Sequence, residues 1–123
     1  MTRQILDEPR INPAVREKIA GHHADIVKEV ADAAAANAVL VVGLRQNVPG
    51  KHARKILDMN NIAFKYLEYG SYFSGWRRRN ALKMWSGWPT FPMIFVKGVF
   101  IGGAADLARL FASGELARLL EHK

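Results

Sequence analysis

The chemistry open to this chain of 123 residues is limited first by an absence, since it contains no cysteine. Without a thiol there is no cysteine nucleophile, no disulfide and no thiolate metal ligand. His22 and His23 are neighbours on a predicted helix and cannot face one ligand together, so no metal site is expected. The sequence also contains no Ser-His-Asp arrangement, phosphate-binding glycine loop or paired carboxylate motif.

Three short segments could still build a ligand site if the fold brings them together. Residues 47–50 enter a predicted helix, residues 88–92 enter a predicted strand, and Gly102-Gly103 precedes the last predicted helix. The free N–H groups at a helix N-terminus favour anions. Asn47 suits the N-cap position of its helix, where its side-chain oxygen would accept a backbone hydrogen bond. The alternative is that Asn47 contacts a ligand.

The net charge of +7 is concentrated in the middle of the chain. Residues 45–83 contain nine basic and two acidic residues, which accounts for the whole excess, because the rest of the chain has nine of each. Such a local positive field attracts anions, including nucleic acid and acidic proteins. The alternative is a set of separately solvated side chains, and the run 77–79 spreads around a helix rather than forming one patch.

The apolar pattern predicts one mixed α/β domain after a short extension. Helices are expected at about 12–21, 23–36, 51–60, 75–86 and from 103 onward with a break at Gly114, and strands at 39–44, 62–69, 92–96 and 99–101. The first two strands should run parallel, and Lys97-Gly98 should close a hairpin between the last two. We divide the chain into an N-terminal extension with a short helix, residues 1–22, and a domain, residues 23–123.

The most specific stretch of sequence runs from Ser86 to Gly103 and reads SGWPTFPMIFVKGVFIGG. It resembles the Trp-Pro-Thr-aromatic-Pro and Gly-Gly signature of the glutaredoxin family, more closely its monothiol branch, over about residues 24–121. The resemblance implies a thioredoxin-like fold, with a four-stranded mixed sheet flanked by helices and here an extra N-terminal helix. It places Asn47 where the family has its nucleophilic cysteine, whose sulfur also ligates an iron–sulfur cluster in monothiol members.

The same resemblance implies a cleft for glutathione. In the family, a basic residue just before the cysteine and an arginine in the third helix hold the glycine carboxylate, and Arg45 and Arg79 fall near those positions. An arginine fork suits a carboxylate well. Phe91, which precedes an expected cis-Pro92, would offer its backbone N–H and C=O to the cysteinyl unit of glutathione.

At the other end of the implied cleft, Gly102, Gly103 and the first helical turn would receive the γ-glutamyl carboxylate. Here the chain departs from the family. An aspartate or serine usually follows two residues after the glycine pair, whereas this chain has Ala104-Ala105 and then Asp106. One anchor of the glutathione site is therefore expected to be weakened.

Three functional hypotheses follow. The first is a redox-inactive module that binds glutathione, a γ-glutamyl peptide or a partner protein of the glutaredoxin network. The second is the family's glutathione-dependent oxidoreductase or iron–sulfur carrier activity, which needs a thiolate that the chain lacks, so whether the protein is an enzyme stays open. The third is a basic module for nucleic acid or an acidic protein, of which nucleic acid is the less expected.

No cofactor follows with certainty from the sequence, and glutathione is the candidate. No apolar run approaches the roughly 20 residues that span a bilayer, so no membrane association is expected. The first residues do not resemble a secretory signal, and the cytoplasm is the expected location.

Overall fold

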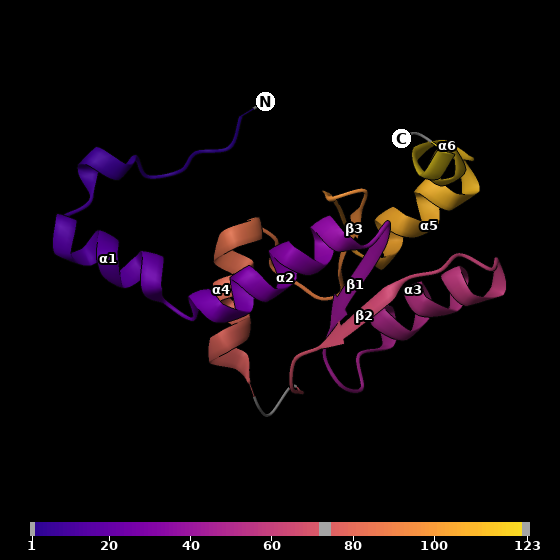
Figure 1. The fold of residues 1–123 in the computed structure, drawn as a ribbon, viewed down its shortest axis with the longest axis horizontal. Helices are drawn as coiled ribbons and strands as arrows, with labels where there is room; N and C mark the ends of the chain where they lie inside the picture. The colour runs from indigo at the N-terminus through magenta and orange to yellow at the C-terminus, as the bar shows by residue number, and fades with distance from the viewer. Residues whose placement is uncertain (1, 72–74, 122–123) are drawn as a thin grey trace.

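Four strands form one mixed sheet in the computed structural model, which describes residues 2–71 and 75–121 (Figure 1). The strands are β1 (Val39–Gly43), β2 (Lys65–Glu68), β3 (Met93–Val96) and β4 (Val99–Gly102), in the order β2-β1-β3-β4. β1 is parallel to β2 and antiparallel to β3, and β3 and β4 form an antiparallel hairpin. This is the four-stranded mixed sheet that the sequence predicts.

Helices cover both faces of the sheet, because β1 is apolar on both sides. Leu40 and Val42 pack in one core with α2 (Ala24–Ala36) and α4 (Trp76–Ser86). Val39 and Val41 alternate with them and pack in a second core on the opposite face. That second core contains α3 (Val48–Met59), α5 (Ala104–Ala112) and α6 (Glu115–Glu121). The result is a three-layer arrangement with β1 buried at its centre.

The N-terminal extension lies outside these layers (Figure 1), and Arg3 connects it to α4 through a hydrogen bond of 3.3 Å to the carbonyl of Ser86. It consists of a short 3₁₀ helix, η1 (Glu8–Arg10), and α1 (Pro13–Gly21), and neither element buries a residue. As the sequence predicts, Asn12 caps α1, its side-chain oxygen accepting a hydrogen bond of 2.9 Å from the backbone N–H of Ala14. No helix in the described ranges is long and apolar enough to cross a membrane. The boundary between residues 22 and 23 stays a prediction.

Two elements begin three residues away from where their apolar patterns begin. α3 begins at Val48, as the predicted cap at Asn47 requires, rather than at Lys51, because Pro49 fits the first helical turn, where a backbone N–H has no intrahelical partner. β2 begins at Lys65 rather than Ile62. Ile62 is still held by α3, since its N–H donates to the carbonyl of Leu57 at 2.9 Å, and the alternating apolar pattern cannot show this contact.

Candidate functional site

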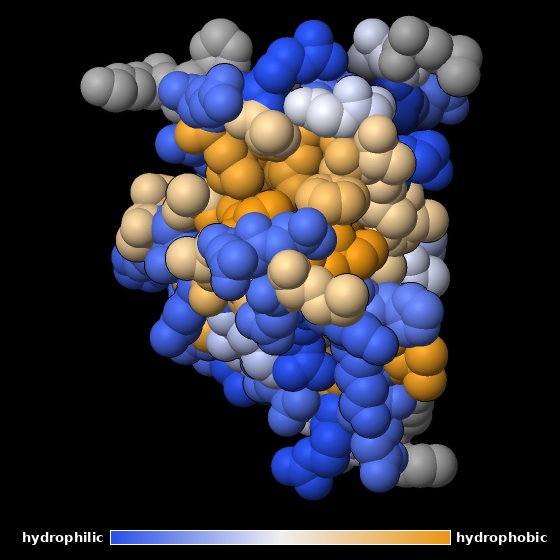
Figure 2. All heavy atoms as spheres, turned by 90° about the vertical axis from the view of Figure 1, so that its right-hand side faces the viewer, coloured by the Kyte–Doolittle hydropathy of each residue, from blue (hydrophilic) through white to orange (hydrophobic). Residues whose placement is uncertain are grey.

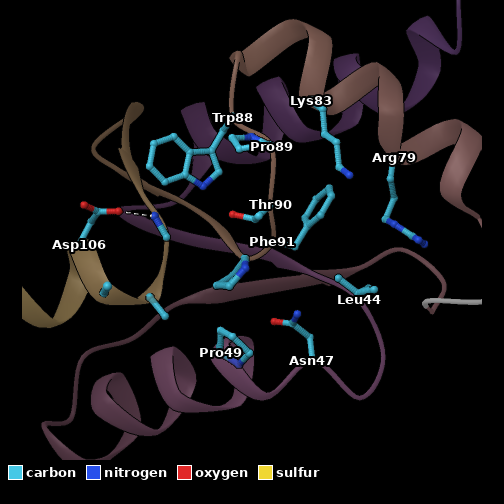
Figure 3. A pocket seen from close by; sticks show the side chains of 14 residues that line it. Leu44, Asn47, Pro49, Arg79, Lys83, Trp88, Pro89, Thr90, Phe91 and Asp106 are labelled. Carbon is cyan, nitrogen blue, oxygen red and sulfur yellow. Dashed lines mark hydrogen bonds between the residues drawn. The ribbon is translucent and has the colours of Figure 1, made fainter.

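A cleft of about 500 Å³ lies beyond the carboxyl end of β1, where the three expected segments meet (Figure 3). Open α/β sheets bind ligands at this kind of position. Three parts of the chain supply the side chains that line the cleft. They are the end of β1 with the start of α3, α4 with the loop before β3, and the start of α5. The lining residues are Leu44, Asn47, Pro49, Arg79, Lys83, Trp88, Pro89, Thr90, Phe91, Pro92, Gly103, Ala104, Ala105 and Asp106.

Asn47 is buried at the base of the cleft, with 6% of its surface exposed. Its Oδ1 accepts a hydrogen bond of 2.7 Å from the backbone N–H of Gly50, so the capping interpretation is confirmed. A side chain at residue 50 would crowd this contact, because a Cβ there would lie 2.9 Å from the same oxygen. Asn47 also lines the cleft, so capping α3 and contacting a ligand are compatible roles.

Arg79 and Lys83 form a cationic end of the cleft (Figure 3). Arg79 is 6% exposed, and its Nη1 donates to the backbone carbonyl of Tyr69 at 3.0 Å. Burial lowers the pKa of this guanidinium below its ordinary value. Lys83 follows one turn later on α4, and its Nζ lies 6.0 Å from the centre of the Phe91 ring. Two cations on one helix face can hold a carboxylate.

The middle of the cleft is formed by the loop that leads into β3. The peptide bond between Phe91 and Pro92 is cis, and both residues are buried. Trp88 packs edge-on against Phe100, with ring centres 5.5 Å apart. The indole Nε1 of Trp88 is buried and has no hydrogen-bond partner among the described residues. This wall is therefore largely apolar and contains one unsatisfied donor.

The end opposite Arg79 and Lys83 is acidic (Figure 3). Asp106 sits in the first turn of α5, and its Oδ2 accepts a hydrogen bond of 2.9 Å from the backbone N–H of Gly103. Its Oδ1 accepts a hydrogen bond from the guanidinium of Arg109, which is exposed. Asp106 thus caps its own helix, and both of its carboxylate oxygens are engaged by this chain.

Six of the eight residues singled out from the sequence line the cleft: Asn47, Arg79, Phe91, Pro92, Gly103 and Asp106. Arg45 does not. The left-handed backbone of Gln46, with φ at 62°, turns the chain between Arg45 and Asn47, and Arg45 lies exposed with its Nε 4.0 Å from Glu68. Gly102 is buried at the end of β4 and does not line the cleft either.

Sequence reasoning missed Lys83 as a site residue. Its spacing of four residues from Arg79 places the two side chains on one helix face, and this signal could have found it. No comparable signal marks Leu44, which is buried where the chain leaves β1.

A second cavity, of about 650 Å³, lies at the opposite end of the sheet, where β1 begins. It is lined mainly by alanines and by Val96, Val99, Ile101 and Leu119, with Lys97 as its one charged residue. Figure 2 shows apolar side chains gathered on the face of the molecule at the right of Figure 1. This cavity is larger, but it lacks the several converging polar groups that fix a small ligand, so the first cleft is the better candidate.

The basic residues of segment 45–83 do not form one surface. Those of α3 and those of α4 belong to helices on opposite faces of the sheet. Several are also engaged locally: Arg78 pairs with Asp25 at 2.9 Å, Arg54 stacks over Tyr66, and Arg77 lies over Trp76. This separation argues against a continuous nucleic-acid interface.

The site does not fit an iron–sulfur cluster. Such a cluster is held by cysteine thiolates, and the chain has none. An asparagine amide at position 47 is not a ligand for iron, and the described residues contain no group of three histidine, aspartate or glutamate side chains arranged to hold a metal.

Comparison with known proteins identifies relatives over nearly the whole chain. A family model for glutaredoxin matches residues 48–101. A glutaredoxin-like protein of Dictyostelium discoideum is 39% identical over 121 residues, covering 98% of this chain and 97% of its own length. The mitochondrial monothiol glutaredoxin-5 of Schizosaccharomyces pombe is 36% identical over 69 residues, which cover 56% of this chain and 47% of that protein.

Solved structures agree on the fold. A buckwheat glutaredoxin–glutathione complex superposes with a TM-score of 0.73 at 20% identity, covering 81% of this chain and 91% of that one. Glutaredoxin C1 of a poplar hybrid, in its holo form, superposes with a TM-score of 0.71 at 22% identity over 82% and 91%. With its cis-Pro92 loop, its glycine pair and an asparagine at the start of α3, this cysteine-free chain belongs to the glutaredoxin family.

Proposed function

We propose that the protein binds glutathione, or a closely related small peptide, in the cleft between α3, α4 and α5 without forming a covalent bond to it. The observation that carries the proposal is the meeting of six residues, selected from the sequence, in one cavity of about 500 Å³. This volume suits a small ligand. The cationic pair Arg79 and Lys83 is matched to the carboxylate of a peptide C-terminus.

Binding without covalent chemistry follows from Asn47. Disulfide exchange requires a thiolate to attack a sulfur, and an amide cannot replace it. The capping contact also gives Asn47 a structural role that a thiol would fill poorly. Oxidoreductase and iron–sulfur carrier activities are therefore not part of the proposal.

Relatives support the ligand class, since one similar solved structure is described as a glutaredoxin–glutathione complex. Partner proteins of the glutaredoxin network remain a further hypothesis. Cytoplasmic location also remains a prediction, because similar proteins carry mitochondrial and chloroplastic names.

Calorimetric titration with reduced glutathione tests the proposal. We expect measurable heat, together with NMR shifts confined to the cleft, at Phe91, Arg79 and Gly103. Lys83→Ala should weaken binding about tenfold, the order expected for losing one charge-assisted contact. Arg78→Ala is the matched control, because it removes a cation from the same helix outside the cleft. No heat and no shifts at millimolar ligand would overturn the proposal.

A further inference from the structure

β2 is the outermost strand on one side of the sheet, because the strand order is β2-β1-β3-β4 (Figure 1). On its inner side Lys65–Glu68 pairs in register with residues 40–43 of β1. Within the described ranges, no strand lies on its outer side. Alternate backbone N–H and C=O groups of an edge strand point away from the sheet and can pair with another extended chain. β2 therefore offers a place where a further strand can be added.

Basic side chains follow this edge from one end of β2 to the other. Lys65 is exposed at the first residue of the strand. At the last residue, Glu68, the Nε of Arg45 lies 4.0 Å from the carboxylate. Between them, the guanidinium of Arg54 on α3 lies 4.0 Å from the centre of the Tyr66 ring. The whole length of β2 is thus lined with cations.

The Arg54 guanidinium is held in place, but its charge is not neutralised. Its position over Tyr66 is a cation–π contact, which fixes the side chain against the strand. Its Nε is buried and has no hydrogen-bond partner among residues 2–71 and 75–121. Lys51 lies one turn earlier on the same face of α3. In this described part of the chain, none of Lys51, Arg54 and Lys65 forms an ion pair.

The acidic side chains of this region leave an excess of positive charge. Glu68 accepts a hydrogen bond of 3.0 Å from the hydroxyl of Tyr66 and lies beside Arg45, so it is already engaged. Asp58 is exposed one turn after Arg54 on α3 and offsets part of the charge. A second copy of this chain would bring the same cations to the edge, and like charges opposite each other destabilise a strand pair. An acidic strand would be attracted to it.

We propose that the outer edge of β2 binds an extended acidic segment of another protein by strand addition. Main-chain hydrogen bonds to β2 provide affinity, and carboxylates of the segment pair with Arg54 and Lys65. The arginine fork suits a carboxylate, and stacking on Tyr66 reduces the freedom that Arg54 loses on binding. Neither cation lines the ligand cleft, so the inference does not depend on glutathione binding.

Titration of the full chain with a blocked peptide, acetyl-Thr-Glu-Glu-Val-Glu-Glu-Thr-amide, tests the proposal by NMR. Adjacent glutamates face opposite sides of an added strand, as Lys65 and Tyr66 do on β2. We expect shifts along Lys65–Glu68 and at the Arg54 side chain, and an affinity that falls as salt is raised. With glutamine in place of glutamate, the peptide should bind at least about tenfold more weakly.

A peptide with proline in place of valine keeps every charge but lacks one backbone N–H. It should bind about fivefold more weakly, the order expected for one lost hydrogen bond. Arg54→Gln and Lys65→Gln should each weaken binding of the parent peptide about three- to fivefold. Lys97→Gln is the matched control, because it removes an exposed cation from the turn between β3 and β4, away from β2.

Equal binding of the glutamate and glutamine peptides, or of the proline peptide and its parent, would overturn the proposal. A single-stranded oligonucleotide that shifts the β2 residues at lower concentration than the parent peptide would also overturn it, by assigning this edge to nucleic acid. If no peptide binds, the proposal fails while glutathione binding in the cleft is untouched, so the two failures are distinguishable.

Discussion

Asn47, which the sequence predicts at the thiol position of the family, caps α3 at the base of the cleft. The turn after β1 must still present a helix N-terminus to the cleft, and that terminus needs an acceptor for its first N–H groups. The 2.7 Å bond from Gly50 to Asn47 Oδ1 supplies one. The residue that we predict at the family's thiol position therefore stabilises the start of α3.

Replacing Asn47 by alanine should lower the free energy of unfolding by about 1 kcal/mol, because the N–H of Gly50 loses its buried acceptor. Asn47→Ser is the matched control, since serine is also a good N-cap and should keep most of the stability. Chemical denaturation measures both values. Equal stability of the alanine and serine variants would contradict the capping role.

Alanine substitutions at the two glycines before α5 should lower the stability of the protein by different amounts. Gly102→Ala should destabilise the protein by more than about 1 kcal/mol, because it combines a positive φ with a clash against Asp106. Gly103→Ala should cost less, since its Cβ would meet Pro92 O and Trp88 Nε1 at ordinary distances of 3.5 and 3.7 Å. Thermal unfolding of the two variants compares them directly, and the reverse order would refute this explanation.

At the scale of elements, most of the fold could be predicted because its signals are local. β1 is an unbroken apolar run, and α2 buries Ile26, Val30 and Ala34, whose spacing of four residues places them on one helix face. Asn12 and Asn47 mark helix starts through hydrogen bonds within their own turns.

The parts that could not be predicted depend on contacts between distant residues. Arg45 was selected because the family resemblance implies a basic residue just before position 47, but the turn at Gln46 directs it to solvent. The self-capping of Asp106 depends on a backbone conformation at Gly102 that no local pattern reports. Which cleft residues contact a ligand likewise remains a proposal, because such contacts depend on a molecule outside the chain.

The N-terminal extension provides a test at the element scale. Its helices bury no residue, and Arg3 donates a hydrogen bond of 3.3 Å to the carbonyl of Ser86 in the domain. Removing residues 1–22 should therefore change the free energy of unfolding by less than about 1 kcal/mol. Urea denaturation of the truncated and full chains measures the difference, and a loss of several kcal/mol would show that the extension belongs to the domain.

At the scale of the whole molecule, the three layers are tied together at their edges by polar contacts as well as by the two cores. Tyr69, which follows β2, donates its hydroxyl to Glu29 on α2. Tyr66 on β2 lies under the guanidinium of Arg54 on α3, 4.0 Å from the ring centre, and also donates to Glu68 of its own strand at 3.0 Å. Burial and then these hydrogen bonds raise the pKa of both tyrosines above the ordinary value near 10.

Stability should therefore fall at alkaline pH. Below pH 9 both tyrosines are neutral in the folded and unfolded chains, and they contribute no pH dependence. Above about pH 10 the unfolded chain loses these protons while the folded chain keeps them, so the free energy of unfolding decreases as pH rises. Tyr69→Phe should make this decrease shallower in denaturation curves collected from pH 8 to pH 11, and an unchanged slope would exclude Tyr69 as a cause.

The chain belongs to the glutaredoxin family and contains no cysteine. We predict that Asn47 occupies the position of the family's thiol, and placing a thiol there tests this most directly. Asn47→Cys should form a mixed disulfide with oxidised glutathione, seen by mass spectrometry as one added glutathionyl group, because a helix N-terminus lowers a thiol pKa and the cleft holds the peptide. Ser113→Cys places a thiol at the far end of α5 as the control. We predict rapid modification of the position 47 thiol and slow modification of the control. An unreactive thiol at position 47, or equal rates at both positions, would contradict the account.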